Sequence, residues 1–255
     1  MSLQFIMGNS GSGKSYCLYD TVVREAIENP DKNYLVIVPE QFTMQTQKDL
    51  CLAHPKGGIM NIDVLSFGRL AYRVFEEVGQ DARVVLDDEG KNLVLRKIAG
   101  ECEKDLKVFK GNLKKQGYIS EVKSVLSEFA QYGVDFERLD DFMKEVPPES
   151  YLHYKLDDIR TIYEKFEEYL SEKYITKEEM LDVLSDAVPY SDILKGSVVA
   201  MDGFTGFTPV QNRLIGELFS VCEKVMITVT MDGRENPYVY EHPYQIFALG
   251  KQMVT

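Results

Sequence analysis

The stretch GNSGSGKS at residues 8–15 decides the fold class, because it has the form G-x-x-x-x-G-K-S. It follows the apolar run LQFIM at Leu3–Met7, which predicts a buried strand that ends at glycine. The residues after it are apolar at helical spacing up to Asn29 and Pro30, where a helix must end. A glycine-rich loop between a strand and a helix turns backbone N–H groups toward a bound phosphate. We therefore predict a phosphate-binding loop made of Gly8, Asn9, Ser10, Gly11, Ser12, Gly13, Lys14 and Ser15.

The chemistry of this motif assigns roles to its last two residues and indicates ATP as the ligand. Lys14 is expected to reach the β- and γ-phosphates, and the Ser15 hydroxyl to ligate Mg²⁺. The second Mg²⁺ ligand that we expect is Asp202, because it ends the apolar run Ser197–Met201 and open parallel sheets bind ligands at that end. No carboxylate or amide follows Asp202 before Gln211. A general base is worth roughly 10² to 10⁴ in rate, so we predict no catalytic residue and little or no hydrolysis.

Five short apolar runs predict the strands of one sheet: Leu3–Met7, Tyr34–Val38, Ile62–Leu65, Ser197–Met201 and Lys224–Met231. Helical patterns separate them, one capped by Ser66 and one that starts at Pro209. This alternation indicates an α/β fold with a parallel sheet. Between residues 87 and 188 the pattern is helical, with almost no strand signal. We therefore predict one β/α domain of residues 1–86 and 195–255, interrupted by an all-helical insertion of residues 87–194.

Several features of the remaining sequence carry further expectations. Thr176 and Glu179 form the capping box of one helix in the insertion. The lysine-rich stretch from Lys104 to Lys115 is interpreted as a solvated helix face rather than a DNA-binding patch. An amphipathic segment from Tyr244 runs to the last residue, so we expect a fragment of a larger protein. An apolar stripe predicts the buried side of one long helix: Leu152, Leu156, Ile159, Tyr163, Phe166 and Leu170.

Composition limits the partners and the compartment. The net charge is −12, whereas a free-standing nucleic-acid-binding protein usually has a basic surface, so we expect any DNA contact to be local, weak or shared. No apolar run approaches the roughly 20 residues that cross a bilayer, which favours a cytoplasmic protein without membrane contact. The four cysteines are scattered, so we expect buried thiols and no metal or iron–sulfur site within this chain: Cys17, Cys51, Cys102 and Cys222.

Four stretches together resemble the amino-terminal region of the AddB family: GNSGSGKS, VPEQFTMQTQ at 38–47, VLSFGRLAYRVF at 64–75 and MDGFTGFTPVQ at 201–211. AddB is the second subunit of a bacterial helicase–nuclease that processes broken DNA ends for recombinational repair. The resemblance implies the first domain of a superfamily 1 helicase, a P-loop NTPase (RecA-like) fold with a helical insertion. It also implies an AddA-type motor subunit as heterodimeric partner, single- and double-stranded DNA ends as substrates, and recognition of the Chi signal. The nuclease and its iron–sulfur cluster are expected only in a carboxy-terminal region that this chain lacks.

The departures from the helicase pattern imply a degraded motor. Superfamily 1 motors have D-E-x-Q-D at the metal strand, where this chain has Gly203, Thr205 and Gly206 in place of the glutamate, the glutamine and the second aspartate. The glutamine that recognises adenine in such motors is expected to be missing, because only seven residues precede Gly8 in this sequence. By the same resemblance, four residues are candidates for DNA contact: Gln41, Thr43, Ser66 and Phe67.

Two other functions remain open on the sequence. A small-molecule kinase also uses G-x-x-x-x-G-K-S, and a lid could draw on Arg69, Arg73, Arg83 and Arg96. The chain could also be a scaffold with a vestigial nucleotide site.

Overall fold

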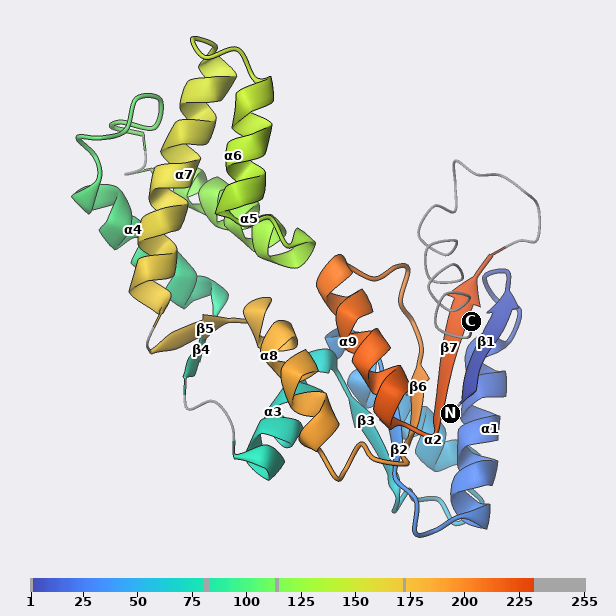
Figure 1. Ribbon diagram of the computed structural model, residues 1–255. Helices are drawn as coiled ribbons and strands as arrows, with labels where there is room; N and C mark the ends of the chain where they lie inside the picture. Colours follow the sequence, from blue (N-terminus) through green and yellow to red (C-terminus); the bar gives the residue numbers. More distant parts are fainter. Residues whose placement is uncertain (1, 80–82, 113–114, 172, 232–255) are drawn as a thin grey trace. The chain divides into compact units, whose positions relative to one another are not determined.

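The structure is a computed structural model that describes residues 2–79, 83–112, 115–171 and 173–231. The chain divides into two compact units, one of Met1–Gln80 with Leu181–Thr255 and one of Asp81–Met180 (Figure 1). The sequence had placed these divisions after residues 86 and 194. The amphipathic segment predicted from Tyr244 lies outside the described residues.

The first unit is built on a five-stranded parallel sheet with the order β1-β7-β6-β2-β3. Each strand begins and ends within one residue of a predicted apolar run. β7 separates β1 from β6, so the strand before the glycine-rich loop and the strand before Asp202 are not neighbours. The bounds are β1 Ser2–Gly8, β2 Tyr34–Ile37, β3 Ile62–Leu65, β6 Val198–Met201 and β7 Lys224–Thr230.

The helices of this unit cover both faces of the sheet. Right-handed connections place α1 and α2 on one face and α3 and α9 on the other, because the chain crosses the sheet in opposite directions before and after β3. The predicted caps are present: the Ser66 hydroxyl accepts from Arg69 N at 3.3 Å, and Pro209 opens α9. The bounds are α1 Lys14–Glu28, η1 Glu40–Phe42, α2 Thr43–Ala53, α3 Phe67–Val78, α8 Glu179–Ala187, η2 Val188–Tyr190 and α9 Pro209–Val221.

The central strands of the sheet are buried on both faces. All four residues of β2 and of β6 are buried, as expected for a parallel sheet between two helical layers. The core under α1 and α2 is one cluster: Leu18, Val22, Val23, Ala26, Tyr34, Val36, Val38, Leu50, Ile62, Val198, Ala200 and Met226.

The second unit is mainly helical, but the prediction that the insertion is all-helical is wrong. β4 (Val84–Leu86) and β5 (Tyr174–Thr176) pair as a two-stranded parallel sheet. Three-residue strands are too short to show a period, and β4 precedes the predicted insertion. The helices are α4 Asp88–Glu101, α5 Gln116–Tyr132, α6 Phe136–Glu145 and α7 Tyr151–Leu170.

Helix α7 carries most of the predicted apolar stripe. Leu156, Ile159, Phe166 and Leu170 are buried, whereas Leu152 in the first turn is 47% exposed. The capping box of Thr176 and Glu179 is present, with Glu179 N donating to Thr176 Oγ1 at 3.2 Å and Thr176 N donating to Glu179 Oε2 at 2.8 Å.

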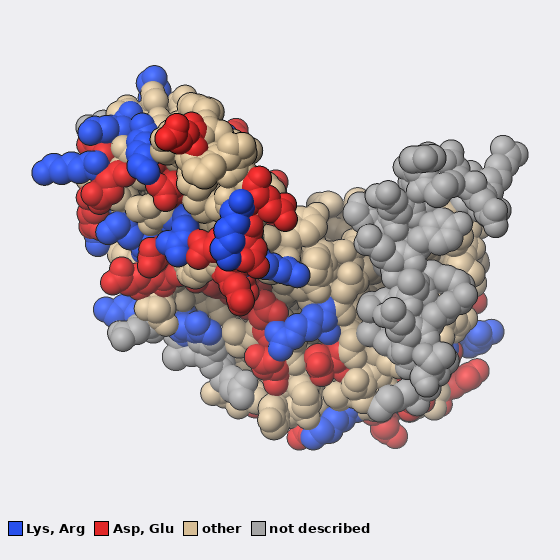
Figure 2. All heavy atoms as spheres, turned by 45° about the horizontal axis from the view of Figure 1, so that its top comes forward, with Lys and Arg blue, Asp and Glu red and all other residues tan. Residues whose placement is uncertain are grey.

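The lysine-rich stretch after α4 is not the helix face that the sequence predicted. Its described residues form turns and bends, held by the buried carboxylate of Asp158. That carboxylate accepts backbone N–H groups of Lys107, Val108 and Phe109 at 2.7–2.8 Å. The described lysines of the stretch, Lys104, Lys107, Lys110 and Lys115, are exposed. Acidic and basic side chains intermix over the described part of the surface in Figure 2. This mixture offers no broad basic area in that view.

Candidate phosphate-binding site

The carboxyl ends of four parallel strands bring the predicted site residues to one edge of the sheet. The segments that leave these ends are the glycine-rich loop after β1, Glu40–Phe42 after β2, Ser66 after β3 and Asp202 after β6. In an open α/β sheet this edge is the place where ligands bind.

The backbone of the glycine-rich loop favours glycine at two positions, and a third glycine, Gly8, lies against the Ser12 side chain. Gly11 has φ 75° and Gly13 φ 84°, in the left-handed region where a Cβ is strained. A Cβ on Gly8 would collide with the Ser12 hydroxyl, so the loop also closes tightly on itself. The glycines of the motif are therefore explained by the observed conformation of the loop.

The loop and the first turn of α1 expose backbone N–H groups, and no anionic side chain lies in either segment. α1 begins at Lys14, its N-cap Gly13 supplies no side-chain acceptor, and no acidic residue lies in the first turn. The N-terminal amides of a helix carry a partial positive charge, which such an end leaves available to an anion. The Lys14 ammonium donates to Asn9 O at 2.8 Å and so lies across the loop. Residues 9–13 and Ser15 are exposed. The arrangement is suited to bind a phosphate group.

Asp202 lies at the end of β6 and is held by hydroxyl groups from two other elements. It is 6% exposed; Tyr19 Oη donates to its Oδ2 at 2.7 Å and Thr228 Oγ1 to its Oδ1 at 2.6 Å. Tyr19 stands four residues after Ser15, on the same face of α1. Burial, and after it the hydrogen bond to Asp202, raise the pKa of Tyr19 above its ordinary value, against an opposing hydrogen bond from Thr46. The phenol therefore stays protonated as a donor.

The oxygen donors at this edge fit a hydrated Mg²⁺ that also binds phosphate. A carboxylate has about four acceptor sites, and the two hydroxyls take two of those on Asp202. Within the described residues no group of three or more His, Cys, Asp or Glu side chains could hold a metal. Mg²⁺ usually needs only one or two protein oxygens when nucleotide phosphates and waters complete its shell. Ser15 and Asp202 are the residues that would hold it.

Three of the four candidate DNA contacts have buried side chains. Thr43 donates to Glu40 O at 2.9 Å, and Ser66 caps α3. Phe67 packs against Phe204, with ring centroids 5.3 Å apart. Gln41 is the exposed one of the four.

Sequence reasoning missed four residues of this edge. Phe42 is 46% exposed beside Gly203. Tyr19 and Thr228 donate to Asp202, and Thr46 contacts the Tyr19 hydroxyl. Only Tyr19 carried a sequence signal, since its spacing of four from Ser15 places both on one helix face.

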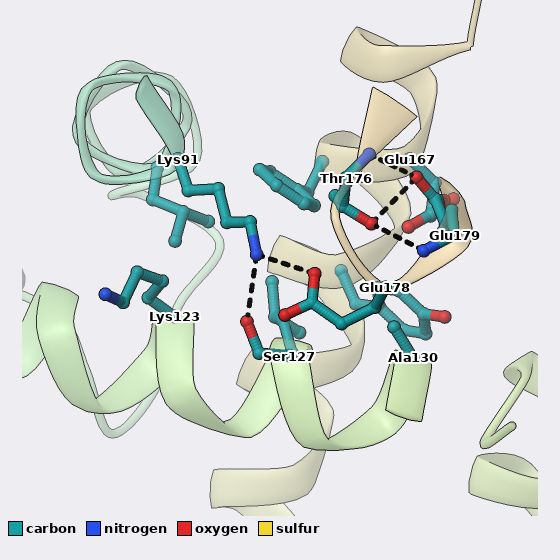
Figure 3. A pocket seen from close by; sticks show the side chains of 12 residues that line it. Lys91, Lys123, Ser127, Ala130, Glu167, Thr176, Glu178 and Glu179 are labelled. Atoms are coloured by element: carbon teal, nitrogen blue, oxygen red, sulfur yellow. Dashed lines mark hydrogen bonds and ion pairs between the residues drawn. The ribbon is translucent and has the colours of Figure 1, made fainter. Parts of the chain in front are cut away.

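A second polar cluster lies inside the helical unit, where its residues bind one another (Figure 3). The Lys91 ammonium, 3% exposed, donates to Glu178 Oε2 at 2.7 Å and Ser127 Oγ at 3.2 Å. Nearby, burial and then the charge of Glu179 raise the pKa of Glu167 to about 7. The cavity between them measures about 10 Å³, room for about one water molecule. The cluster supports the helices and is too small for a ligand.

The cysteines divide between the two environments. Cys102 and Cys222 are buried, as expected, whereas Cys17 is exposed and Cys51 partly so; all four are free thiols. The expectation of buried thiols is therefore wrong for Cys17. None of the helices in the described ranges combines the length and apolar character needed to cross a bilayer.

Fold and site together define a mixed α/β protein with a glycine-rich loop at the carboxyl edge of a parallel sheet. Residues 5–255 match the family described as ADDB, N-terminal, and the chain belongs to that family. A relative from Lachnoclostridium phytofermentans is 46% identical over 254 residues, 99% of this chain and 22% of the relative. Relatives from Alkaliphilus metalliredigens and Clostridium kluyveri are 35% and 39% identical over 91% of this chain and 20% of their own length. All three carry the name of a subunit of an ATP-dependent helicase/deoxyribonuclease. The chain thus spans about a fifth of their length.

Proposed function

We propose that this chain is the ATP-binding, helicase-like module of a helicase–nuclease that processes DNA double-strand breaks. ATP occupies Gly8–Ser15, with Lys14 on the β- and γ-phosphates and Mg²⁺ between Ser15 and Asp202. The observation that carries the proposal is the loop itself: two glycines with a left-handed backbone, Gly11 and Gly13, an uncapped helix N-terminus and a lysine lying across the loop. A P-loop NTPase (RecA-like) fold is part of the same proposal, supported by the parallel sheet with Asp202 at its carboxyl edge.

The role in DNA repair rests on the family and on the names of the relatives. In that role the module serves recognition of DNA, including the Chi signal, and assembly with an AddA-type motor subunit. Gln41 and the neighbouring Phe42 are the exposed side chains at the sheet edge on which a DNA contact would rest.

The module binds ATP but hydrolyses it little or not at all. Gly203 stands where a motor has glutamate, and its φ of 79° is strained for any residue with a Cβ. The chain therefore lacks the glutamate that would act as the base, and the local backbone conformation also disfavours a glutamate at this position.

Two of the four arginines proposed for a kinase lid are held in ion pairs with nearby carboxylates. Arg69 pairs with Glu40 at 3.2 Å and Arg73 with Asp63 at 2.7 Å. Phosphoryl transfer to a small acceptor molecule would support the kinase function instead. If the chain bound no nucleotide at all, a scaffold with a vestigial site would be the function that remains.

Nucleotide-dependent thermal unfolding tests the proposal. With Mg²⁺ and ATP or ADP at about 100 times its Kd, the fold should gain about 2.7 kcal/mol. Lys14→Ala should lose most of that gain, whereas Lys48→Ala, an exposed lysine of α2, should keep it. An equal gain in Lys14→Ala and wild type would place the nucleotide elsewhere.

A further inference from the structure

Tyr19 joins α1 to two other elements beside the glycine-rich loop. Its hydroxyl lies 2.7 Å from Asp202 Oδ2 at the end of β6 and 3.2 Å from Thr46 Oγ1 in α2. Ser15 and Tyr19 line one hollow of about 550 Å³ between α1 and α2. The tyrosine therefore stands one helical turn from the residue whose hydroxyl would ligate Mg²⁺.

The directions of these hydrogen bonds follow from the donors available. A phenol has one proton, and an ionised carboxylate only accepts, so Tyr19 gives its proton to Asp202. Thr46 must then donate to the Tyr19 oxygen. On the other side, Thr228 Oγ1 donates to Asp202 Oδ1 at 2.6 Å. Hydroxyl protons thus point at the carboxylate from both sides, and hydrogen bonds to an ionised group are shorter and stronger than neutral ones.

Two hydroxyls of different elements also fix the plane of the carboxylate. If the Asp202 side chain turned, Tyr19 or Thr228 would lose its acceptor in a place where little water can replace it, because Asp202 is only 6% exposed. The acceptor sites that remain on Asp202 therefore keep one direction. A cation shell built on waters needs such a fixed acceptor.

We propose that Tyr19 is a positioning residue for the divalent cation of the nucleotide site. The inference rests on the proposed function, since it concerns how Asp202 is presented to a cation that accompanies the nucleotide. Tyr19→Phe keeps the ring and removes one oxygen, so the Asp202 carboxylate loses one of its two hydroxyl donors. The glycine-rich loop and Lys14 are untouched, and with them the contacts to the phosphates.

Calorimetric titration of ADP, with Mg²⁺ and with EDTA, separates these contributions. In Tyr19→Phe the affinity for ADP with Mg²⁺ should fall about tenfold, the loss of one hydrogen bond to a charged group. The affinity in EDTA should equal that of wild type. Tyr72→Phe, an exposed tyrosine of α3, is the matched control and should change neither value. Thr228→Val removes the other hydroxyl and should show the same selective loss.

Three outcomes decide between the alternatives. Unchanged affinity with Mg²⁺ in Tyr19→Phe overturns the inference, and so does an equal loss with and without Mg²⁺, which indicates a packing role. If Tyr19→Phe does not fold, the Thr228→Val titration decides by the same criteria. A wild-type chain that binds no ADP in either condition instead overturns the proposed function itself.

Discussion

Gly203 lies against Phe42, so that a Cβ built on Gly203 would stand 3.5 Å from Phe42 Cδ2 and 3.4 Å from Pro39 Cδ. Gly203 also has φ 79°, which a side chain adopts only with strain. The residue after Asp202 is therefore glycine for a local reason. A glutamate at this position would carry the strain of a left-handed backbone conformation.

We predict that Gly203→Glu does not turn the chain into an ATPase. A base accelerates hydrolysis only when the γ-phosphate is already held in line and its developing charge is neutralised. Turnover should stay near background with and without single-stranded DNA in a phosphate-release assay. Gly203→Ala shares the backbone strain without the carboxylate and is the control. DNA-stimulated turnover of about 1 s⁻¹ or more in Gly203→Glu alone, the low end of ordinary enzyme rates, contradicts the prediction.

We expect the 255-residue chain to bind single-stranded DNA weakly. Its net charge is −12, and non-specific affinity grows with the number of phosphates that lysine and arginine neutralise. Fluorescence anisotropy with an oligonucleotide across roughly 50–200 mM salt measures both affinity and its salt dependence. Tight binding that weakens steeply with salt would show a basic site that the mixed surface of Figure 2 does not reveal.

Glu167 predicts a pH-dependent stability of the chain. Its pKa is raised from 4.5 to about 7 in the folded state, chiefly by burial. On raising the pH, the unfolded chain releases this proton near 4.5 and the folded chain only near 7. Stability from this group is thus present at low pH, falls between these values and is gone above pH 7.

The Glu167→Gln variant tests this pH dependence. Urea unfolding should show it more stable than wild type at pH 8, by about 1–3 kcal/mol, and no more stable near pH 4. Glu168→Gln, at the exposed next position, should follow wild type at every pH. Parallel curves for wild type and Glu167→Gln from pH 4 to 8 would show that Glu167 ionises normally.

The sequence predicted the elements whose signal is local. The strand before Gly8, the caps at Ser66 and Thr176, and the helix from Pro209 each rest on a few neighbouring residues, and the structure shows all of them. β5 was missed because three residues show no period and its partner β4 is 88 residues away, from Leu86 to Tyr174.

The missed site residues share another cause, which is long-range pairing. Thr46 reaches Tyr19 because α1 and α2 pack against each other, and Thr228 reaches Asp202 because β6 and β7 are neighbouring strands. The turns of the lysine-rich stretch depend in the same way on Asp158 in α7, which lies about 50 residues further along the chain. Charge and spacing within a segment do not show such partners.

A calorimetric titration of ADP with Mg²⁺ into wild type, Gly13→Ala and Gly79→Ala tests directly whether the glycine-rich loop binds the nucleotide. Both glycines have a left-handed φ, 84° and 69°, and neither has an atom near the position of a Cβ, so the two variants carry similar backbone strain. Only Gly13 lies in the glycine-rich loop; Gly79 ends α3. We expect one ADP per chain in wild type and Gly79→Ala, and an affinity at least about tenfold weaker in Gly13→Ala, a difference of about 1.4 kcal/mol. Equal binding by Gly13→Ala and Gly79→Ala would contradict this expectation.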